Sequence, residues 1–285
     1  MRSMRTGSLA ILCGCLLAAP GGRAVHGDGP APRPFGVLNQ RSIALTAEYW
    51  NPILEFVGRT SGVPLRLVMG KTAPETTQMA VRGELAFVYT NHLFTPERVR
   101  LGYRVIARPD NAGIQGNLVV LGGSAAQTMA DLAGKTVAFP SREAFVGYWL
   151  PMDAILRARL AVRPVFAGNQ EGALAQLAAG SVDAAAVNSG ILRDYARRTK
   201  LDVRVIWASE VFPDLCVMAA PTVPPDVVAA VRNAFVGMNA SKEGRATLAS
   251  VAEGLGLAAP VGFVEARDAE YEPYRRFFRG TLVKE

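Results

Sequence analysis

The chain has 285 residues, of which 50% are hydrophobic and 19% are charged, so it is long enough for one large globular domain or two lobes. Its formal net charge is +7, but Arg2, Arg5 and Arg23 contribute three of these charges, and the chain without its first 24 residues carries 7 − 3 = +4. The remaining Lys and Arg residues are scattered and form no basic run with interleaved aromatic residues, which argues against nucleic-acid binding.

The N-terminus has the pattern of an export signal. Arg2 and Arg5 precede an apolar stretch from Leu9 to Ala19, which is too short to span a bilayer and is followed by Gly, Pro and Ala. Residues 1–24 are therefore predicted to be a signal peptide, cleaved after Ala24 or after Ala19. An exported protein of this kind is expected in the periplasm.

A lipoprotein signal is the alternative. The run Leu12-Cys13-Gly14-Cys15 loosely resembles a lipobox, and Cys15 would then carry the lipid and anchor the protein to the membrane. The third cysteine, Cys216, lies in an apolar run and has no partner for an internal disulfide. It is predicted to be a small buried hydrophobic residue.

Residues 25–34 are rich in Gly, Pro and Ala and are predicted to be a tether. From Phe35 onwards, short apolar strands alternate with longer amphipathic segments, the pattern of βαβ units around a parallel sheet. The first pass through this pattern consists of a strand at 35–38, a helix at 46–59, a strand at 65–69, a helix opened by a capping box at Thr72 and ended by Gly83, and a strand at 85–89 that leads to Asn91.

A second pass repeats this layout. It consists of a strand at 135–139, a helix capped by Ser141 and running to about 159, a strand at 163–167, a helix capped by Asn169 and ended by Gly180, and a strand at 183–187 that leads to Asn188. Gly83 precedes Asn91 by eight residues, and Gly180 precedes Asn188 by the same distance. Two units of equal build predict an α/β fold with two Rossmann-like βαβ lobes.

The remaining elements join the two lobes. A strand at 117–121 is predicted to carry the chain from lobe one to lobe two, and a strand at 215–219 to carry it back, so that the two crossing strands form a hinge. Lobe one is predicted to comprise residues 35–115 and 216–285, and lobe two residues 116–215. Further predicted elements are helices at 190–198, 225–238, 243–252 and 264–278 and a strand at 203–207.

Ligands of open parallel sheets bind beyond the carboxyl ends of the strands. The loops that follow the predicted strands are polar and rich in hydrogen-bond donors, and several lie at helix N-termini, where backbone N–H groups and the helix dipole favour an anion. The predicted ligand-binding residues are Tyr89, Asn91, Ser141, Arg142, Asn169 and Asn188, with Gln40, Arg41 and Thr72 as weaker candidates.

Alternative roles stay open for several of these residues. Thr72, Ser141 and Asn169 are equally well explained as helix caps without any ligand contact. Arg41 and Arg142 could clamp an anion or be solvated loop charges.

No motif for catalysis or for a cofactor is present. The chain has two histidines, and no group of His, Cys, Asp and Glu has the spacing of metal ligands. A nucleophile elbow and a phosphate-binding loop of the P-loop type are also missing from the sequence. The sequence predicts a protein that is not an enzyme and needs no cofactor or metal.

From about Phe35 to Phe278 the chain resembles the phosphate/phosphite/phosphonate-binding proteins of ABC transporters, the PhnD-like group within the type 2 periplasmic binding protein fold. The resemblance is carried by the order and spacing of Phe35-Gly36-Val37, Trp50-Asn51-Pro52-Ile53-Leu54, Gly83 to Tyr89, Asp131 to Phe139 and Val203 to Trp207. It implies a two-lobed clamp that traps an oxyanion, with Tyr89 at the position of a tyrosine that contributes to the cleft.

The residues expected to hold the phosphorus oxygens differ from the family pattern. The stretch that matches a Ser-Thr-Ser-Gly turn runs from Ser141 to Gly147 and keeps only Ser141 and a displaced glycine. Asn169 stands where phosphonate binders carry a histidine, and Asn188-Ser189 lies near the place of an acidic residue. The resemblance therefore implies the fold and a binding role, while the identity of the ligand stays open.

The expected function is that of an extracytoplasmic solute-binding protein, a monomer that captures a small polar, anionic ligand for the membrane permease of an ABC transporter. One alternative is a ligand-sensing module for a separate membrane histidine kinase. A hydrolase on the same fold is a weaker alternative, because histidines are scarce and a nucleophile motif is missing.

Overall fold

The structure is a computed structural model that describes residues 31–284. The predicted signal peptide and residues 25–30 of the predicted tether lie outside the described residues. The first strand begins at Arg33, so residues 33 and 34, which were expected in the tether, belong to a strand. No helix within residues 31–284 is both long enough and apolar enough to cross a membrane.

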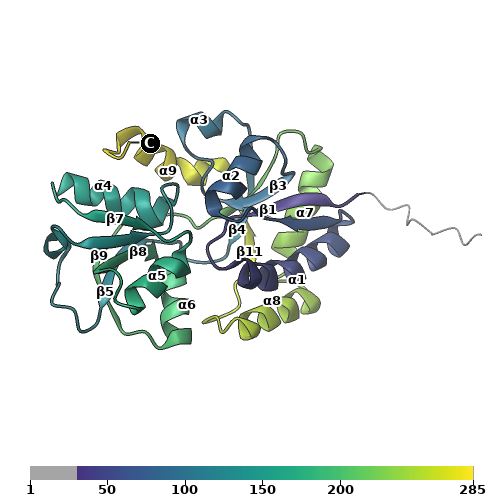
Figure 1. Ribbon diagram of the computed structural model, residues 1–285. Coiled ribbons are helices and arrows are strands. Elements are labelled where there is room, and N and C mark those ends of the chain that lie inside the picture. Colours follow the sequence, from purple (N-terminus) through teal and green to yellow (C-terminus); the bar gives the residue numbers. More distant parts are fainter. Residues whose placement is uncertain (1–30, 285) are drawn as a thin grey trace, which may run out of the picture. The chain divides into compact units, whose positions relative to one another are not determined.

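Lobe one is built on a six-stranded sheet with the order β11-β4-β10-β3-β1-β2 (Figure 1). Its strands are β1 (Arg33–Val37), β2 (Leu65–Val68), β3 (Phe87–Thr90), β4 (Arg104–Pro109), β10 (Cys216–Ala219) and β11 (Phe263–Glu265). Its helices are α1 (Ile43–Ser61), α2 (Ala73–Val81), α3 (Pro96–Val99), α7 (Pro225–Gly237) and α8 (Lys242–Gly254).

Lobe two is built on a five-stranded sheet with the order β7-β6-β8-β5-β9. Its strands are β5 (Gly116–Leu121), β6 (Thr136–Phe139), β7 (Arg163–Phe166), β8 (Ala184–Asn188) and β9 (Val203–Ala208). Its helical segments are a 3₁₀ turn at Met129–Leu132, a π-helical turn at Phe145–Trp149, α4 (Leu150–Arg157), α5 (Gln170–Ala178) and α6 (Ser189–Thr199).

The two sheets share one layout, which confirms the predicted α/β fold with two lobes. In lobe one, β1 pairs in parallel with β2 and β3, and in lobe two, β6 pairs in parallel with β7 and β8. The expected parallel sheets are mixed, however, because β10 runs antiparallel to β3 and β5 runs antiparallel to β8. Each of these strands enters its lobe directly after a crossing, at the edge where the parallel strands end, so it must run in the opposite direction.

Aromatic packing forms the centre of lobe one. The side chain of Phe35 is fully buried, and its ring contacts those of Trp50, Phe87 and Phe235 at centroid distances of 5.5, 6.4 and 5.8 Å. Burial of large aromatic side chains contributes most of the stabilisation in such a core. The strand ends that lead to the loops of lobe one therefore rest on a rigid base.

Two chain crossings connect the lobes. The first lies between β4 and β5 and the second between β9 and β10, and they pair with each other through Ile114 and Phe212. The amide of each of these residues donates a hydrogen bond of 2.8 Å to the carbonyl oxygen of the other. The crossings thus form a short antiparallel ribbon of one bridged residue pair between the two sheets. The strands that were predicted to cross, at 117–121 and 215–219, lie instead within the sheets of lobe two and lobe one as β5 and β10.

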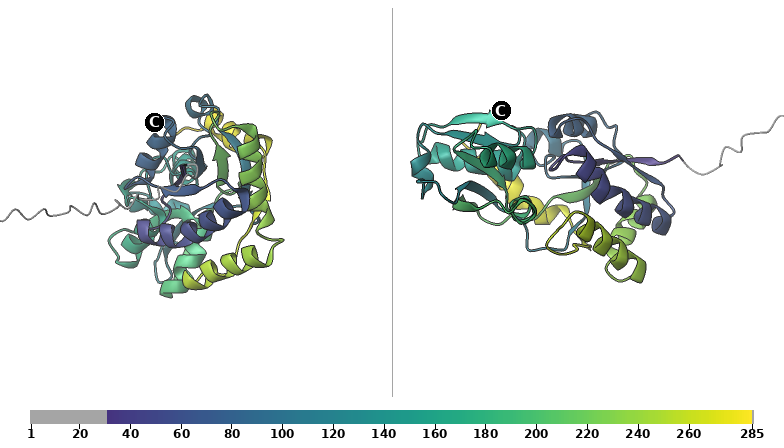
Figure 2. Two further views of the ribbon diagram at one scale, coloured as in Figure 1. Left: turned by 90° about the vertical axis from the view of Figure 1, so that its right-hand side faces the viewer. Right: turned by 60° about the horizontal axis from the view of Figure 1, so that its bottom comes forward.

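A C-terminal helix, α9 (Glu272–Gly280), contacts both lobes (Figures 1 and 2). Towards lobe one, the ring centroid of Tyr274 lies 5.1 Å from that of Phe94, and Tyr271, just before the helix, stacks on the same ring at 4.7 Å. Towards lobe two, Tyr274 lies 4.1 Å from the ring of Phe145. The expected lobe boundaries place this segment in lobe one, whereas the observed contacts make α9 a third connection between the lobes.

Two segments differ from the sequence expectation. Residues 104–109 form β4, a strand that is not predicted from the sequence. The segment predicted as a helix at 264–278 consists of β11, a 3₁₀ turn at Asp268–Tyr271 and α9. The strand forms because Phe263 and Val264 pair with Pro109 and Arg108 of β4. This pairing is made between distant parts of the chain and overrides local helical preference.

Candidate functional site

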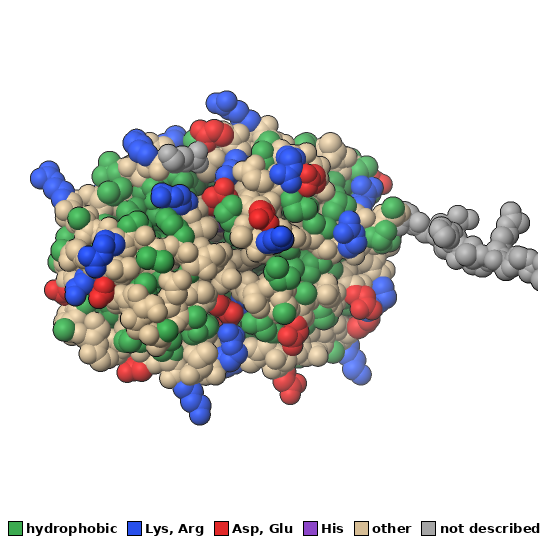
Figure 3. All heavy atoms as spheres, viewed as in Figure 1, with side chains coloured by type: hydrophobic (Ala, Val, Ile, Leu, Met, Phe, Trp, Pro, Cys, Tyr) green, Lys and Arg blue, Asp and Glu red, His purple; other side chains and the backbone are tan. Residues whose placement is uncertain are grey.

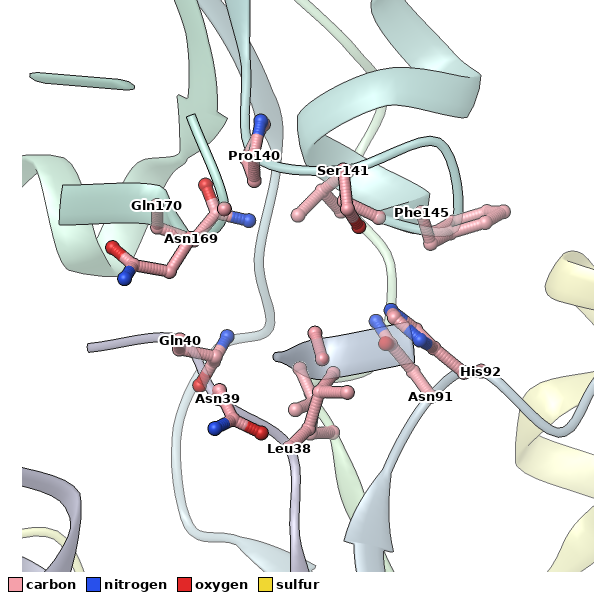
Figure 4. A pocket seen from close by; sticks show the side chains of 15 residues that line it. Leu38, Asn39, Gln40, Asn91, His92, Pro140, Ser141, Phe145, Asn169 and Gln170 are labelled. Carbon is pink, nitrogen blue, oxygen red and sulfur yellow. The ribbon is translucent and has the colours of Figure 1, made fainter. Parts of the chain in front are cut away.

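The loops at the carboxyl ends of the parallel strands meet between the lobes. Cavity one has a volume of about 20 Å³ and lies between the loops after β1 and β3 and the loops after β6 and β7 (Figure 4). Cavity two has a volume of about 260 Å³ and is lined by the N-terminal part of α1, the hinge and α6. Gln40 lines both cavities, which places them side by side.

Three amide side chains of lobe two have their oxygen atoms bound to the protein backbone. Oδ1 of Asn169 accepts a hydrogen bond of 2.8 Å from the amide of Gly172 and caps α5. Oδ1 of Asn188 accepts one of 2.7 Å from the amide of Gly190 and caps α6, and Oε1 of Gln170 accepts one of 2.9 Å from the amide of Asn188. The oxygen positions are fixed by these N–H donors, so the –NH₂ groups are the free ends. A hydrogen-bond acceptor such as an oxyanion fits these donors.

Ser141 follows β6 and lines cavity one with a residue exposure of 6%. It was expected to cap a helix, but the helical turn begins later, at Phe145, with Ala144 in the cap position. Its Oγ atom is buried and has no hydrogen-bond partner among residues 31–284. An unsatisfied buried hydroxyl costs about 1–3 kcal/mol, so a ligand oxygen at this point would be stabilising.

Lobe one faces these groups with Asn39, Asn91 and His92, as Figure 4 shows. The amide of Asn39 is used within lobe one, because Nδ2 donates to the carbonyl of Gly70 and Oδ1 accepts from Thr76. Asn91 is 2% exposed and lies 3.3 Å from the hydroxyl of Tyr274 in α9. Asn91 therefore links cavity one to the helix that bridges the lobes.

His92 is 3% exposed and belongs to a charged cluster between the lobes. Its Nδ1 atom lies 3.0 Å from Oγ of Thr77 and 3.5 Å from Oε2 of Glu143, and Glu143 accepts a hydrogen bond of 2.9 Å from Arg98. Burial lowers the pKa of His92, although the Glu143 carboxylate opposes this effect. Burial would raise the pKa of Glu143, but His92 and Arg98 outweigh it and bring that pKa to about 2.

Cavity two has aromatic walls and charges of both signs. Tyr49 and Tyr89 line it, and burial raises the pKa of Tyr49 to about 12 and that of Tyr89 well above its usual range. Arg41 of lobe one pairs with Asp194 of lobe two at 2.8 Å. Burial raises the pKa of Asp214, whose carboxylate accepts a hydrogen bond of 2.7 Å from an asparagine.

Residues 31–284 contain no cluster of three or more His, Cys, Asp or Glu side chains that could hold a metal ion. On the face of the molecule seen in Figure 3, acidic and basic side chains are interspersed rather than gathered into patches of one sign. Cavity one thus combines neutral hydrogen-bonding side chains with apolar ones, whereas cavity two also has Arg41, Arg193, Asp194 and Asp214 in its lining.

Residues 35–271 match the protein family described as ABC transporter, phosphonate, periplasmic substrate-binding protein. The chain belongs to this family. A family of substrate-binding proteins agrees with the expectation that the chain is not an enzyme. A search of curated proteins finds no match to the sequence.

Solved structures with the same fold include members of the phosphonate-binding protein family. A binding-protein component of an ABC phosphonate transporter from Pseudomonas aeruginosa has 17% identity and a TM-score of 0.74, with 86% of this chain and 85% of that chain covered. PhnD1 from Prochlorococcus marinus in complex with methylphosphonate has 15% identity and a TM-score of 0.72, with 87% and 97% covered. The aliphatic sulphonate-binding protein SsuA from Escherichia coli has 15% identity and a TM-score of 0.56, with 88% and 86% covered.

The cleft of this substrate-binding protein is lined by most of the residues expected from the sequence. The predicted residues that line cavity one are Gln40, Asn91, Ser141 and Asn169. The predicted residues that line cavity two are Gln40, Arg41, Tyr89 and Asn188. The loop ends of both lobes therefore converge, although on two adjoining cavities rather than one.

Thr72 and Arg142 line neither cavity. Oγ of Thr72 accepts a hydrogen bond of 3.4 Å from the amide of Glu75 and caps α2. This agrees with the alternative in which Thr72 is a helix cap without ligand contact. The guanidinium of Arg142 lies over the ring of Phe166 at 4.7 Å, so it packs on the outer part of lobe two.

His92, Gln170 and Asn39 also line cavity one, although they are not among the predicted ligand-binding residues. Gln170 and Asn39 are direct chain neighbours of the predicted residues Asn169 and Gln40. His92 follows Asn91 directly after β3, and this adjacency is the signal that could have found it. The partner of His92, Glu143, comes from the other lobe, so no local pattern indicates the pair.

Proposed function

We propose that this protein binds a small phosphonate or phosphate-like oxyanion at cavity one and delivers it in the periplasm to the permease of an ABC transporter. The observation that carries the proposal is the set of unused donors in lobe two. The hydroxyl of Ser141 has no protein partner, and the amide oxygens of Asn169 and Gln170 are bound to backbone N–H groups. The N-terminus of α5 adds a favourable dipole for an anion.

The chemistry of the relatives supports this ligand class. One structure with the same fold holds methylphosphonate, and another belongs to a protein that binds aliphatic sulphonates. Both ligands carry a tetrahedral group with several oxygen acceptors. Neutral hydroxyl and amide donors of the kind found at cavity one can satisfy such acceptors without a paired cation.

Cavity two gives room for the organic part of the ligand. It adjoins cavity one at Gln40, and its volume of about 260 Å³ far exceeds the 20 Å³ of cavity one. Cavity one has space on the order of one water molecule in this conformation, so the lobes must part to admit the oxyanion and must close on it less tightly than they close here. We infer that the ligand stabilises the closed state by contacting both lobes.

Calorimetric titration of the purified protein tests the proposal. Methylphosphonate, inorganic phosphate and methanesulphonate are expected to bind, and glutamate and arginine are not. Ser141→Ala is expected to weaken oxyanion binding by about 10- to 150-fold, since a hydrogen bond to a charged group contributes roughly 1.5–3 kcal/mol.

Ser181→Ala is the matched control, because Ser181 is an exposed serine of the same lobe that lines neither cavity. Its affinity should equal that of the unmodified protein. Equal affinities of the Ser141→Ala and Ser181→Ala variants would show that the oxyanion is held elsewhere. Membrane anchoring through Cys15, a monomeric state and the choice between a permease and a sensor kinase as partner stay predictions.

A further inference from the structure

His92 is a buried titratable group in the cleft to which the proposed function gives no role. Oγ of Thr77 donates its single hydrogen to the carbonyl of Ala73 at 3.0 Å, so it must accept from Nδ1 of His92. The second neighbour of Nδ1 is the Glu143 carboxylate, which can only accept when it is ionised. Both neighbours thus place the hydrogen of the neutral imidazole on Nδ1.

The tautomer leaves Nε2 of His92 without a hydrogen. His92 lines cavity one, and within the described residues no hydrogen bond to Nε2 is formed. In Figure 4, Asn91 and His92 lie on the side of the cavity that faces Ser141 and Phe145. A neutral Nε2 can accept from a ligand but cannot donate to an oxyanion, so protonation would convert it into a donor.

The charged groups around His92 allow its imidazole to bind this second proton. Glu143 is the acidic group that faces His92, and Arg98, which donates 3.1 Å to the His92 carbonyl, is the basic one. They are paired with each other at 2.9 Å, and α2 contributes the uncharged Thr77. The charges of Arg98 and Glu143 cancel each other, so in the empty cleft no net negative charge favours a protonated His92. An oxyanion at cavity one would add that negative charge and stabilise the imidazolium.

Resting on the proposed function, we propose that His92 takes up one proton from solvent when an oxyanion binds, so that the imidazolium bridges Glu143 and a ligand oxygen across the closed cleft. The step forms one N–H bond at Nε2 and breaks none in the protein or the ligand. Glu143 would act as a positioning residue that holds the imidazolium. Glu143 belongs to the stretch from Ser141 to Gly147, which lacks the Ser-Thr-Ser pattern of the family. Instead of supplying hydroxyl donors, this stretch would hold the imidazolium of His92, the donor on the opposite lobe.

Two measurements test the proposal with methylphosphonate and inorganic phosphate as probes. In NMR titrations of the unmodified protein, either probe is expected to raise the titration midpoint of His92 by about one pH unit or more. In calorimetric titrations between pH 6 and pH 8.5, the ratio of the affinity of the unmodified protein to that of His92→Gln should fall with rising pH, by up to about tenfold per pH unit. Protonation of the ligand itself is common to both proteins and cancels in this ratio.

The variant Glu143→Gln should reduce the rise in the His92 midpoint while Nε2 still faces the ligand. Binding of a probe with an unchanged His92 midpoint, or with an affinity ratio that is constant in pH, would overturn this inference alone. Absence of binding by phosphate, methylphosphonate and methanesulphonate would overturn it together with the proposed function. The NMR measurement needs no variant, so poor folding of His92→Gln would not affect it.

Discussion

Asn169 serves both the fold and the proposed site. Its oxygen caps α5 through the amide of Gly172, and this contact fixes which end of the side-chain amide is left for the cleft. Asn188 does the same at the start of α6. A cap contributes about 1 kcal/mol to helix stability whether or not a ligand is present. A substitution that keeps the capping oxygen of Asn169 and replaces only its –NH₂ group should therefore change ligand affinity without lowering the free energy of unfolding.

Asn169→Asp makes this change. One carboxylate oxygen can still cap α5, and a negative charge is favourable at a helix N-terminus, so the free energy of unfolding should stay within about 0.5 kcal/mol or rise. The other oxygen replaces the –NH₂ donor and repels an anion, so the affinity for methylphosphonate should fall at least about 100-fold. Urea unfolding and calorimetric titration measure the two effects.

Ser241→Asp provides the comparison. Ser241 caps α8 through the amide of Gly244 at 2.9 Å and lines neither cavity, so its replacement adds a charge at a helix start away from the cleft. It should leave the affinity unchanged. If Asn169→Asp also binds methylphosphonate normally, the amide nitrogen of Asn169 does not face the ligand.

The sequence allowed good predictions for residues whose role is set by their own helix. The caps at Thr72 and Asn169 follow from short-range preferences and are confirmed. The cap at Ser141 is wrong, because the chain makes an extra turn and a π-helical segment before α4, which no local pattern announces. Arg142 was predicted either to clamp an anion in the cleft or to be a solvated loop charge, but it stacks on Phe166, a residue of β7 that becomes its neighbour only in the folded sheet.

At the scale of elements, the hinge depends on a close approach of the two chain segments that cross between the lobes. The pairing of Ile114 with Phe212 brings the backbone of Gly113 against the second crossing. Gly113 has φ of +95°, and a Cβ atom there would lie 2.4 Å from the carbonyl oxygen of Phe212. A glycine is therefore required at this position both by its dihedral angle and by the space available.

Gly113→Ala should disturb the hinge and destabilise the protein by about 2–4 kcal/mol, since an unfavourable dihedral angle adds to a steric clash with backbone. Urea unfolding at constant pH measures this loss. Ligand affinity should fall as well, because the two lobes are aligned by this ribbon.

Gly134→Ala is the control for the dihedral angle alone. Gly134 has φ of +72°, but nothing lies within 4 Å of a Cβ atom built there. Its replacement should cost only about 1–2 kcal/mol. If Gly113→Ala lowers the free energy of unfolding no more than Gly134→Ala does, the ribbon can move to accommodate the added Cβ atom at little cost.

The sequence predicted the elements with local signals better than those formed by distant pairing. The βαβ repeats were recognised because their strands are apolar and their helices begin with caps and end near glycines. β4 and β11 were not assigned, because they pair with each other across more than 150 residues of chain and β11 has only three residues. The antiparallel direction of β5 and β10 depends on the edge at which the chain enters each sheet after crossing between the lobes. The residues of a single strand carry no signal for this edge.

At the scale of the whole molecule, the described part of the chain holds its lobes together by contacts that do not involve a ligand. Arg41 of lobe one pairs with Asp194 of lobe two at 2.8 Å, and Arg98 pairs with Glu143 at 2.9 Å. The helix α9 adds aromatic contacts with both lobes through Tyr274, whose ring packs against Phe94 of lobe one and Phe145 of lobe two. These contacts favour the closed state, and the affinity for any ligand depends on the population of the state that binds it.

The Glu143 contact should make the stability of the closed state depend on pH. Burial alone would raise the pKa of Glu143 above its ordinary value of 4.5, but His92 and Arg98 bring it to about 2. Because the pKa is lower in the folded than in the unfolded protein, the contribution is complete above about pH 4.5 and is lost as the pH falls through about 2. It amounts to about 3 kcal/mol in total.

Urea unfolding of the unmodified protein and of Glu143→Gln between pH 6 and pH 3 measures this contribution. The difference between their free energies of unfolding should fall by about 2 kcal/mol over this range, because Glu143 becomes protonated in the unfolded protein near pH 4.5 while it is still ionised in the folded protein. Other carboxylates titrate in both proteins, including Asp214, whose pKa is raised by burial and whose effect has the opposite sign, so they cancel in the difference. A difference that is the same at pH 6 and pH 3 would mean that Glu143 is solvated, and that the lobes are not joined through Arg98 and His92 in solution.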